Sequence, residues 1–410
     1  MPNSRLLTLL LIAASTIDMT ACHDEPAVGT VAVADSAGVR LLTALGPGWS
    51  PESGWRLELD LEIGAADGAE SFGRIVDVVP RRIGGVWIAD AHDRRVRGFD
   101  EAGREVAAFG GAGDGPGELR SIGRIGELPD GRLRIGGRMP VELYQFDTAG
   151  RPLGRISVAP DADREVLAAE VAGSGEAPPA GPSMGSWRFG TDGAPFLQTT
   201  TLEASADGVR RHDVLGRVSA EGVSTKLVEW EAPAMRGGIG GELLLLRPAA
   251  SWTPAADGGA WWTRGDGYEV RRVDPAGRLR SVLRRPGARI ALTADVKQRF
   301  RSSLADEADN PALLAMLENA VFPDSLPATA GLWASDDDRL WVGVTDAAWP
   351  LRLEEPNALD VFETSGRYLG RLAIPAGLRP TRVTADHLYG VWEDELGVTY
   401  ARRYRIVREG

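Results

Sequence analysis

The chain has 410 residues, including 51 glycines and 26 prolines, and its formal net charge is −12. This length permits about two to three average domains or one large repeat ring, and so much glycine and proline indicates many turns. An acidic surface keeps a protein soluble and repels phosphate backbones, so we expect no nucleic-acid partner.

Residues 1–21 are typical of an export signal. Arg5 supplies a short positive region, and Leu6 to Ala14 is an apolar stretch too short to span a membrane. Residues 19–22, Met-Thr-Ala-Cys, resemble the lipobox of bacterial lipoproteins. The resemblance implies that the thiol of Cys22 is lipidated and anchors an exported protein to the bacterial cell envelope, on its periplasmic or surface face. The alternative is an ordinary secretory signal with a chance cysteine.

Residues 22–54 are expected to form a tether and a first edge strand. Val31 to Leu42 alternates weakly between apolar and polar side chains, whereas Trp55 to Ile63 alternates cleanly, as a half-buried antiparallel strand does. The second strand precedes the first full repeat and has no partner nearby. We therefore expect it to complete the last sheet of a ring, which removes a free sheet edge.

A short phrase recurs six times in the rest of the chain. Each copy joins a turn, in most copies one that contains glycine, to an apolar or aromatic strand. The copies are residues 84–88, 130–135, 192–197, 257–262, 338–342 and 386–392. The interval of roughly 45 to 90 residues, with four short strands for each copy, predicts a six-bladed β-propeller over residues 55–410.

A second recurring segment predicts the hairpin between the third and fourth strands of a blade. It reads Phe-Asp-Glu-Ala-Gly-Arg at residues 99–104 and returns in related form at 146–151, 273–278 and 362–367. The aspartate can bond the backbone of the turn, and the glycine accepts the positive φ that such turns need. We interpret these residues as structural.

Two glycine-rich segments, 63–75 and 110–125, each link an outer strand to the next inner strand. A glycine-rich loop can bind phosphate, but neither copy has the Gly-Lys-Ser/Thr spacing of a P-loop. No predicted helix follows them to present a positive N-terminus to an anion. They are therefore interpreted as crossings between blades.

Four charged residues near the starts of two inner strands are candidates for ligand binding at the mouth of the channel. Arg74 and Arg124 begin the two strands, and Asp77 and Glu127 follow at comparable positions. The carboxylates could contribute to an oxygen site for a hard cation. The alternative is structural, with the arginines paired to neighbouring acids and the carboxylates facing solvent or an arginine.

Three insertions interrupt the repeat, at residues 159–184, 231–250 and 292–322. The third changes to a helical period, with Thr293 as a plausible N-cap and Pro311 in the first turn of a second helix. We expect a small helical insertion between blades four and five. It either covers apolar surface on one face of the disc or acts as a lid over a binding site.

Residues 86–100, Val-Trp-Ile-Ala-Asp-Ala-His-Asp-Arg-Arg-Val-Arg-Gly-Phe-Asp, resemble one NHL-type propeller repeat. Residues 109–119, with their Gly-Asp-Gly-Pro-Gly-Glu core, resemble bacterial six-bladed propeller lipoproteins of unassigned role. The resemblance implies an all-β fold, a six-bladed β-propeller closed by an N-terminal strand. Members of the NHL family bind partners, bind RNA or, occasionally, act as enzymes, and the acidic balance disfavours RNA here.

Two functions from different classes follow. The first is an envelope-anchored lipoprotein that acts as a binding or scaffolding module for a protein, peptide or glycan, monomeric and without a cofactor. The alternative is a calcium-dependent hydrolase of the lactonase or esterase type with its site at the central channel. Such a site needs oxygen ligands, yet the only asparagines of the mature chain, Asn310, Asn319 and Asn357, lie on no predicted inner strand. Calcium is therefore the less favoured ligand, and no catalytic residue can be named.

Overall fold

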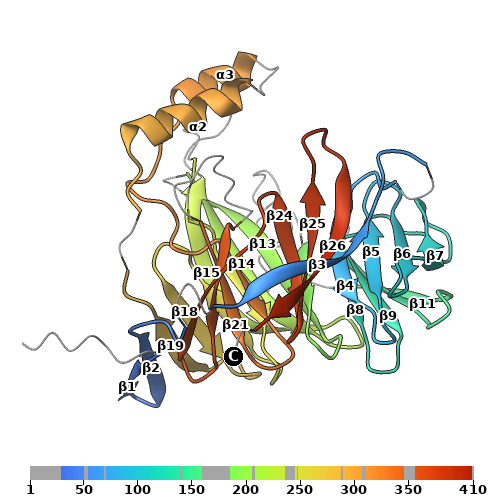
Figure 1. The fold of residues 1–410 in the computed structure, drawn as a ribbon, viewed down its shortest axis with the longest axis horizontal. Coiled ribbons are helices and arrows are strands. Elements are labelled where there is room, and N and C mark those ends of the chain that lie inside the picture. The colour runs from blue at the N-terminus through green and yellow to red at the C-terminus, as the bar shows by residue number, and fades with distance from the viewer. Residues whose placement is uncertain are drawn as a thin grey trace, which may run out of the picture.

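The protein is a six-bladed β-propeller, as the sequence predicts (Figure 1). Its inner strands contact one another in cyclic order, from blade one through blade six and back to blade one. The computed structural model describes residues 29–49, 54–68, 71–138, 141–158, 185–205, 208–235, 245–246, 248–287, 290–306, 311–345 and 356–408. The predicted export signal and its lipidation residue Cys22 lie outside the described residues.

Blades one to three each contain four consecutive antiparallel strands, ordered from the channel outward. Blade one consists of β4 (Ile75–Pro80), β5 (Val86–Asp90), β6 (Arg95–Phe99) and β7 (Glu105–Gly110). Blade two consists of β8 (Arg124–Glu127), β9 (Leu133–Arg138), β10 (Val141–Phe146) and β11 (Pro152–Ser157). Blade three consists of β12 (Gly185–Phe189), β13 (Pro195–Ser205), β14 (Gly208–Val218) and β15 (Ser224–Met235).

Blades four to six complete the ring. Blade four consists of β16 (Ser251–Pro254), β17 (Ala260–Thr263), β18 (Glu269–Val273) and β19 (Leu279–Arg284), extended outward by two further strands. Blade five consists of β20 (Gly331–Ala334), β21 (Leu340–Val344), β22 (Ala358–Phe362) and β23 (Tyr368–Ala373). Blade six consists of β24 (Leu378–Val383), β25 (His387–Glu393), β26 (Thr399–Val407) and the N-terminal β3 (Arg56–Ile63).

The N-terminal strand closes the ring as predicted. β3 is antiparallel to β26, with register pairs that run from Ile63 opposite Ala401 to Arg56 opposite Val407. The last blade thus combines three C-terminal strands with one strand from near the start of the chain. β3 thereby covers the edge of β26 that would otherwise be free, and it joins the two ends of the chain in one sheet.

The N-terminal segment also covers the outer edges of blades four and five. β1 (Val31–Ser36) and β2 (Val39–Ala44) form a hairpin, and β2 is parallel to β19. Beyond this hairpin, the N–H groups of Gly48 and Trp49 donate to the carbonyl of Leu369 on β23. The weak alternation of residues 31–42 therefore does form edge strands. We call residues 29–49 the N-terminal belt.

The recurring hairpin segments have the structural role predicted for them. In blade one the carboxylate of Asp100 accepts the N–H groups of Ala102 and Arg104, at 3.0 and 2.9 Å. Gly103 has φ = 75°. Blades two and four repeat this geometry at Asp147 and at 274–278. These turns therefore need an aspartate acceptor and a glycine with positive φ.

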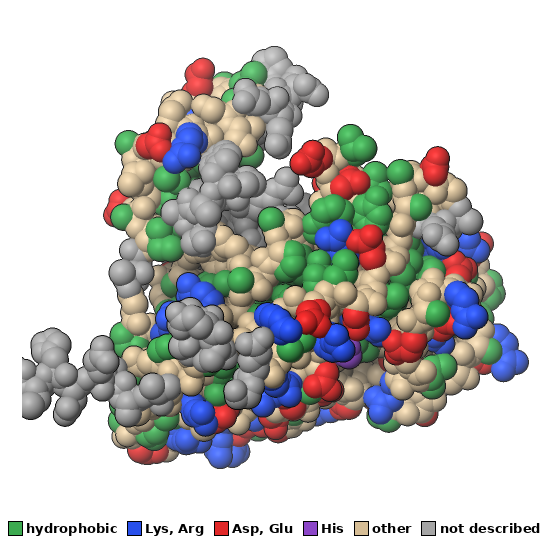
Figure 2. All heavy atoms as spheres, in the orientation of Figure 1, with side chains coloured by type: hydrophobic (Ala, Val, Ile, Leu, Met, Phe, Trp, Pro, Cys, Tyr) green, Lys and Arg blue, Asp and Glu red, His purple; other side chains and the backbone are tan. Residues whose placement is uncertain are grey.

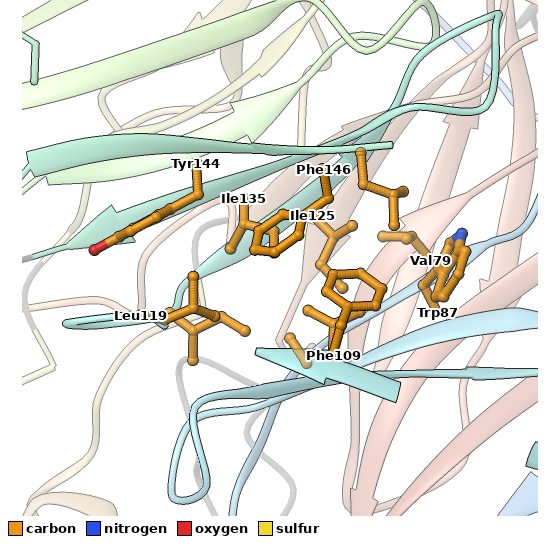
Figure 3. Close-up of a cluster of buried hydrophobic side chains, with 12 residues drawn as sticks. Val79, Trp87, Phe109, Leu119, Ile125, Ile135, Tyr144 and Phe146 are labelled. Carbon is orange, nitrogen blue, oxygen red and sulfur yellow. The ribbon is translucent and has the colours of Figure 1, made fainter. Parts of the chain in front are cut away.

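The core is divided into clusters between neighbouring blades. Figure 3 shows the cluster between blades one and two, in which Val79 and Trp87 face Phe146 across Phe109. The Phe109 and Phe146 rings are 4.7 Å apart. Bulky side chains from the second strands, such as Trp87 and Trp341, fill the widening space between blades.

The third insertion contains α2 (Ala294–Asp306) and α3 (Pro311–Glu318), between blades four and five as predicted. Thr293 is the N-cap, since its Oγ1 accepts the N–H of Val296 at 3.3 Å. In Figure 1 the two helices stand out from the disc. Hydrogen bonds between the segments around Leu292 and Leu326 hold their base. Within the described part of the chain, no helix is long and apolar enough to cross a bilayer.

Of the other two predicted insertions, the first lies outside the described residues and the second differs from the prediction. Residues 159–184 are outside the described residues. The insertion predicted at 231–250 begins too early, because β15 continues to Met235 in pairing with β14. Blade three has strands of 11 and 12 residues, twice the length of most others. The β-branched run Thr199-Thr200-Thr201 favours this extension of β13.

Candidate functional site

A pocket lies at the centre of the ring, and every blade contributes to its wall. It contains about 440 Å³ of space, including its opening to solvent. Two residues from each inner strand line it. They are Asp77 and Val79, Arg124 and Ile125, Arg188 and Phe189, Thr253 and Pro254, Trp333 and Ala334, and Thr381 and Arg382. We call this space the channel pocket.

Asp77 and Arg124 form an ion pair across the first two blades. Arg124 Nη1 lies 2.9 Å from Asp77 Oδ1 and also donates to the Val76 carbonyl at 3.1 Å. The second oxygen of Asp77 accepts the N–H of Ile125 at 2.8 Å. Asp77 is 2% exposed. Both carboxylate oxygens of Asp77 therefore already accept hydrogen bonds from blade two.

Arg188 and Arg382 connect blades that are not neighbours in the ring. Arg188 of blade three donates from Nη1 to the carbonyl of Leu332 in blade five at 2.6 Å. Arg382 of blade six donates from Nη1 to the carbonyl of Phe189 in blade three at 2.9 Å. Within the described part of the chain neither guanidinium has a carboxylate partner, which distinguishes both from Arg124.

The channel pocket consequently has a positive electrostatic character. Its charged lining residues are three arginines and one aspartate, which gives +3 − 1 = +2. Burial, together with repulsion from Arg124 and Arg382, lowers the pKa of Arg188 to about 9. Burial also lowers the pKa of Arg382. A lowered pKa of an arginine means that nearby negative charges and hydrogen bonds do not offset the cost of burying the guanidinium.

The structure brings two of the four predicted site residues into the pocket. Asp77 and Arg124 line it, whereas Arg74 and Glu127 are not among the lining residues. Arg74 is an exposed side chain whose backbone N–H donates to Asp90. Glu127 accepts the N–H of Arg82 at 2.8 Å, which joins blade two to the first hairpin of blade one. Burial raises the pKa of Glu127.

Sequence reasoning missed Arg188 and Arg382, although a positional signal was present. Both lie four residues before the aspartate of a recurring turn, at 188 before 192 and 382 before 386. Thr253 and Ala334 have the same offset from positions 257 and 338, and they too line the pocket. A fixed offset from the turn therefore marks one channel-facing position on each of these inner strands.

The donor set of the channel pocket suits an anion better than a metal ion. Across the described ranges, no group of three or more His, Cys, Asp or Glu residues lies together. The single carboxylate of the pocket, Asp77, is already paired with Arg124. Asn319 and Asn357 are not among the lining residues, and Asn310 lies outside the described residues. Three guanidinium groups would repel a divalent cation at this place.

Comparison with known proteins adds similarity of fold alone. No family model matches the chain, and no curated protein matches it. A member of the DUF4221 family from Bacteroides vulgatus is 8% identical, with a TM-score of 0.49 over 87% of this chain and 99% of that chain.

Two further solved structures are similar at the same low level. The calcium-binding protein regucalcin from Agrobacterium tumefaciens is 14% identical, with a TM-score of 0.41 over 86% of this chain and 95% of its own. Virginiamycin B lyase from Staphylococcus aureus is 12% identical, with a TM-score of 0.39 over 86% of this chain and 100% of its own.

Proposed function

We propose that this protein is a binding module of the bacterial cell envelope that holds its ligand in the channel pocket. The observation that carries the proposal is that all six inner strands converge on one open pocket with both polar and apolar walls. Ligand sites are concave and mostly apolar, with few polar groups that fix orientation.

The ligand classes expected from the sequence are a protein, a peptide or a glycan. The pocket lies between the six inner strands, so it can admit a small molecule or one terminal group of a larger partner. The hydrogen bonds of Arg188 and Arg382 across the ring favour a wall that is formed before the ligand arrives. A preformed site loses less conformational entropy on binding.

The place of action is also part of the proposal. The export signal and the lipobox-like residues before Cys22 support an exported lipoprotein that is held to the membrane by its acyl chains. The resemblance of residues 86–100 to an NHL repeat supports partner binding by a six-bladed ring. We propose a monomer, because one ring already contains the whole pocket.

The alternative is a calcium-dependent hydrolase at the same channel. The regucalcin structure is named as calcium-binding, and that description belongs to regucalcin. In the present chain, Asp77 would have to leave Arg124 before its oxygens could coordinate a cation. The binding proposal requires no such rearrangement, so we favour it.

A thermal-shift screen tests the proposal. The purified protein is heated with short peptides, oligosaccharides or small organic acids, and a ligand at 100 times its Kd should stabilise the fold by about 2.7 kcal/mol. The variant Ala334→Trp fills the channel pocket and should abolish the shift. Ala102→Trp, at an exposed turn of blade one, is the matched control and should retain it.

Two results would count against this function. The binding proposal fails if no compound of these classes stabilises the protein, or if Ala334→Trp responds as fully as Ala102→Trp. Stabilisation by calcium alone, reversed by a chelator, would instead favour the hydrolase.

A further inference from the structure

We propose that the ligand of the channel pocket is a small organic anion whose carboxylate or phosphate group is bound jointly by Arg188 and Arg382. This inference rests on the proposed function, since it specifies the chemistry of the ligand in the same pocket. It goes further by assigning two binding residues and by excluding neutral and cationic ligands.

The first argument is charge. The whole chain carries a net charge of −12, and acidic and basic side chains are interspersed over the face shown in Figure 2. The channel pocket reverses this balance, with three arginines against Asp77. An uncompensated buried charge is costly. A bound anion would supply the missing negative charge and relieve the repulsion between Arg188 and Arg382.

The second argument is the supply of free hydrogen-bond donors. A guanidinium has five N–H donors. The bonds to Leu332 and Phe189 each use one nitrogen of an arginine. Both arginines line the channel pocket, and their remaining nitrogens are not among the buried, unpartnered side-chain atoms of the described residues. We take these nitrogens as the donors for the ligand. The planar fork of a guanidinium matches the two oxygens of a carboxylate or phosphate.

The third argument is the rest of the wall, in which apolar side chains outnumber the two threonines, Thr253 and Thr381. Val79, Ile125, Phe189, Pro254 and Trp333 surround the charged groups. A bare inorganic ion would leave these surfaces without a partner. A ligand with an anionic group at one end and an apolar or ring-shaped body at the other satisfies both parts of the pocket.

A competing explanation is that these arginines only hold the ring together. Arg134 shows what such a residue looks like. Its Nη1 donates to the carbonyl of Gly193 at 3.1 Å, it joins blades two and three, and burial lowers its pKa. Arg134 does not line the channel pocket. It is therefore a matched control for Arg188 and Arg382.

Isothermal titration calorimetry with benzoate, phenyl phosphate and neutral benzyl alcohol tests the inference on the purified protein. We expect the two anions to bind and benzyl alcohol not to bind. Arg188→Gln and Arg382→Gln should each weaken anion binding by roughly tenfold to 100-fold, as expected for a charge-assisted hydrogen bond. Arg188→Lys should restore part of the affinity, and Arg134→Gln should bind as the unmodified protein does.

Each outcome separates this inference from the proposed function. If a neutral compound from the thermal-shift screen binds and the anions do not, the channel binds a ligand but the inference is wrong. If Arg188→Gln lowers the melting temperature without changing anion affinity, the arginines only hold the blades of the ring together. If no compound of any class binds, the proposed function itself fails. Should Arg188→Gln not fold, Arg382→Gln remains a test, and unchanged anion affinity in that variant would overturn the inference.

Discussion

The guanidinium of Arg403 joins the strand that closes the ring to the blade on the other side of the closure. Its Nε lies 3.0 Å from Asp60 on β3, and its Nη1 lies 2.6 Å from Glu101 in blade one. Arg403 itself is on β26 and is 8% exposed. One side chain thus links the C-terminal strand, the N-terminal strand and the first blade.

We predict that Arg403→Met lowers the free energy of unfolding by about 1.5–3 kcal/mol, because methionine cannot replace the hydrogen bonds to the two carboxylates. Urea denaturation would measure the change. Arg405→Met is the control, since Arg405 is paired with Glu58 between the same two strands, but at the surface. An exposed pair contributes about 1 kcal/mol or less. Equal losses in the two variants would contradict a special role for Arg403.

The repeat architecture could be predicted from the sequence because each blade uses the same local chemistry. The six recurring phrases form the second strands of the six blades, and the aspartate and glycine of the 99–104 hairpin set its turn. The closing strand at residues 56–63 was also predictable, since its alternation is clear and it lacks a local partner. Local patterns therefore determine most of the ring.

The long-range contacts of the N-terminal belt could not be predicted in the same way. β2 is parallel to β19, some 240 residues later in the chain (281 − 40 = 241). No turn connects the two strands, and alternation alone does not identify a partner. The sequence also could not predict which residues far apart in the chain meet in the channel pocket. Asp77 and Arg124 were predicted from two successive inner strands, whereas Arg188 and Arg382 come together only after the ring has closed.

The N-terminal belt can be tested at Gly370 of β23. This glycine has φ = 151°, and a Cβ there would overlap with the indole ring of Trp49. Gly154 occupies the same Leu-Gly-Arg motif in blade two with φ = 144°, but a Cβ there would meet nothing within 4 Å. The two positions therefore share their backbone strain and differ only in the presence of the belt.

We predict that Gly370→Ala destabilises the protein by about 1–3 kcal/mol more than Gly154→Ala does, which is the usual cost of overpacking. Tryptophan fluorescence should change in Gly370→Ala alone, because Trp49 stacks on Trp55 with 4.7 Å between ring centres. Indistinguishable variants would mean that Trp49 does not lie on blade five.

Asp360 is the buried acceptor that joins blades four and five. It is fully buried, and it accepts hydrogen bonds from Tyr268 at 2.8 Å, from Tyr368 at 2.9 Å and from Arg371 at 2.8 Å. Asp360→Asn keeps the shape but removes the charge opposite Arg371. We predict a loss of about 3 kcal/mol in the free energy of unfolding, measured by urea denaturation.

Glu363→Gln is the control for this prediction. Glu363 pairs with Arg367 at 3.5 Å on the surface of the same blade. We expect a change below about 1 kcal/mol for this exposed pair. If Asp360→Asn were as mild as Glu363→Gln, the buried network would not stabilise the junction between blades four and five.

The buried tyrosines give the protein a defined response to alkaline pH. Burial raises the pKa of Tyr144 and of Tyr389 to about 12 in each case. Burial and the charge of Asp360 raise the pKa of Tyr368 and that of Tyr268 well above their usual range. These are four of the six tyrosines in the chain, which has only two lysines to titrate in the same region.

We predict that the free energy of unfolding keeps its full value below about pH 10 and falls as the pH rises above that value. The tyrosines of the unfolded chain ionise near pH 10. Those of the folded protein keep their protons, so the unfolded state binds fewer protons above pH 10 and becomes favoured. Each buried tyrosine should lower the free energy of unfolding by about 1.4 kcal/mol per pH unit in this range. Urea titrations at pH 8 to 11.5 would measure the slope, and Tyr389→Phe should reduce it by one tyrosine's share. Tyrosinate absorbance from all six residues near pH 10, in protein that is still folded, would contradict the prediction.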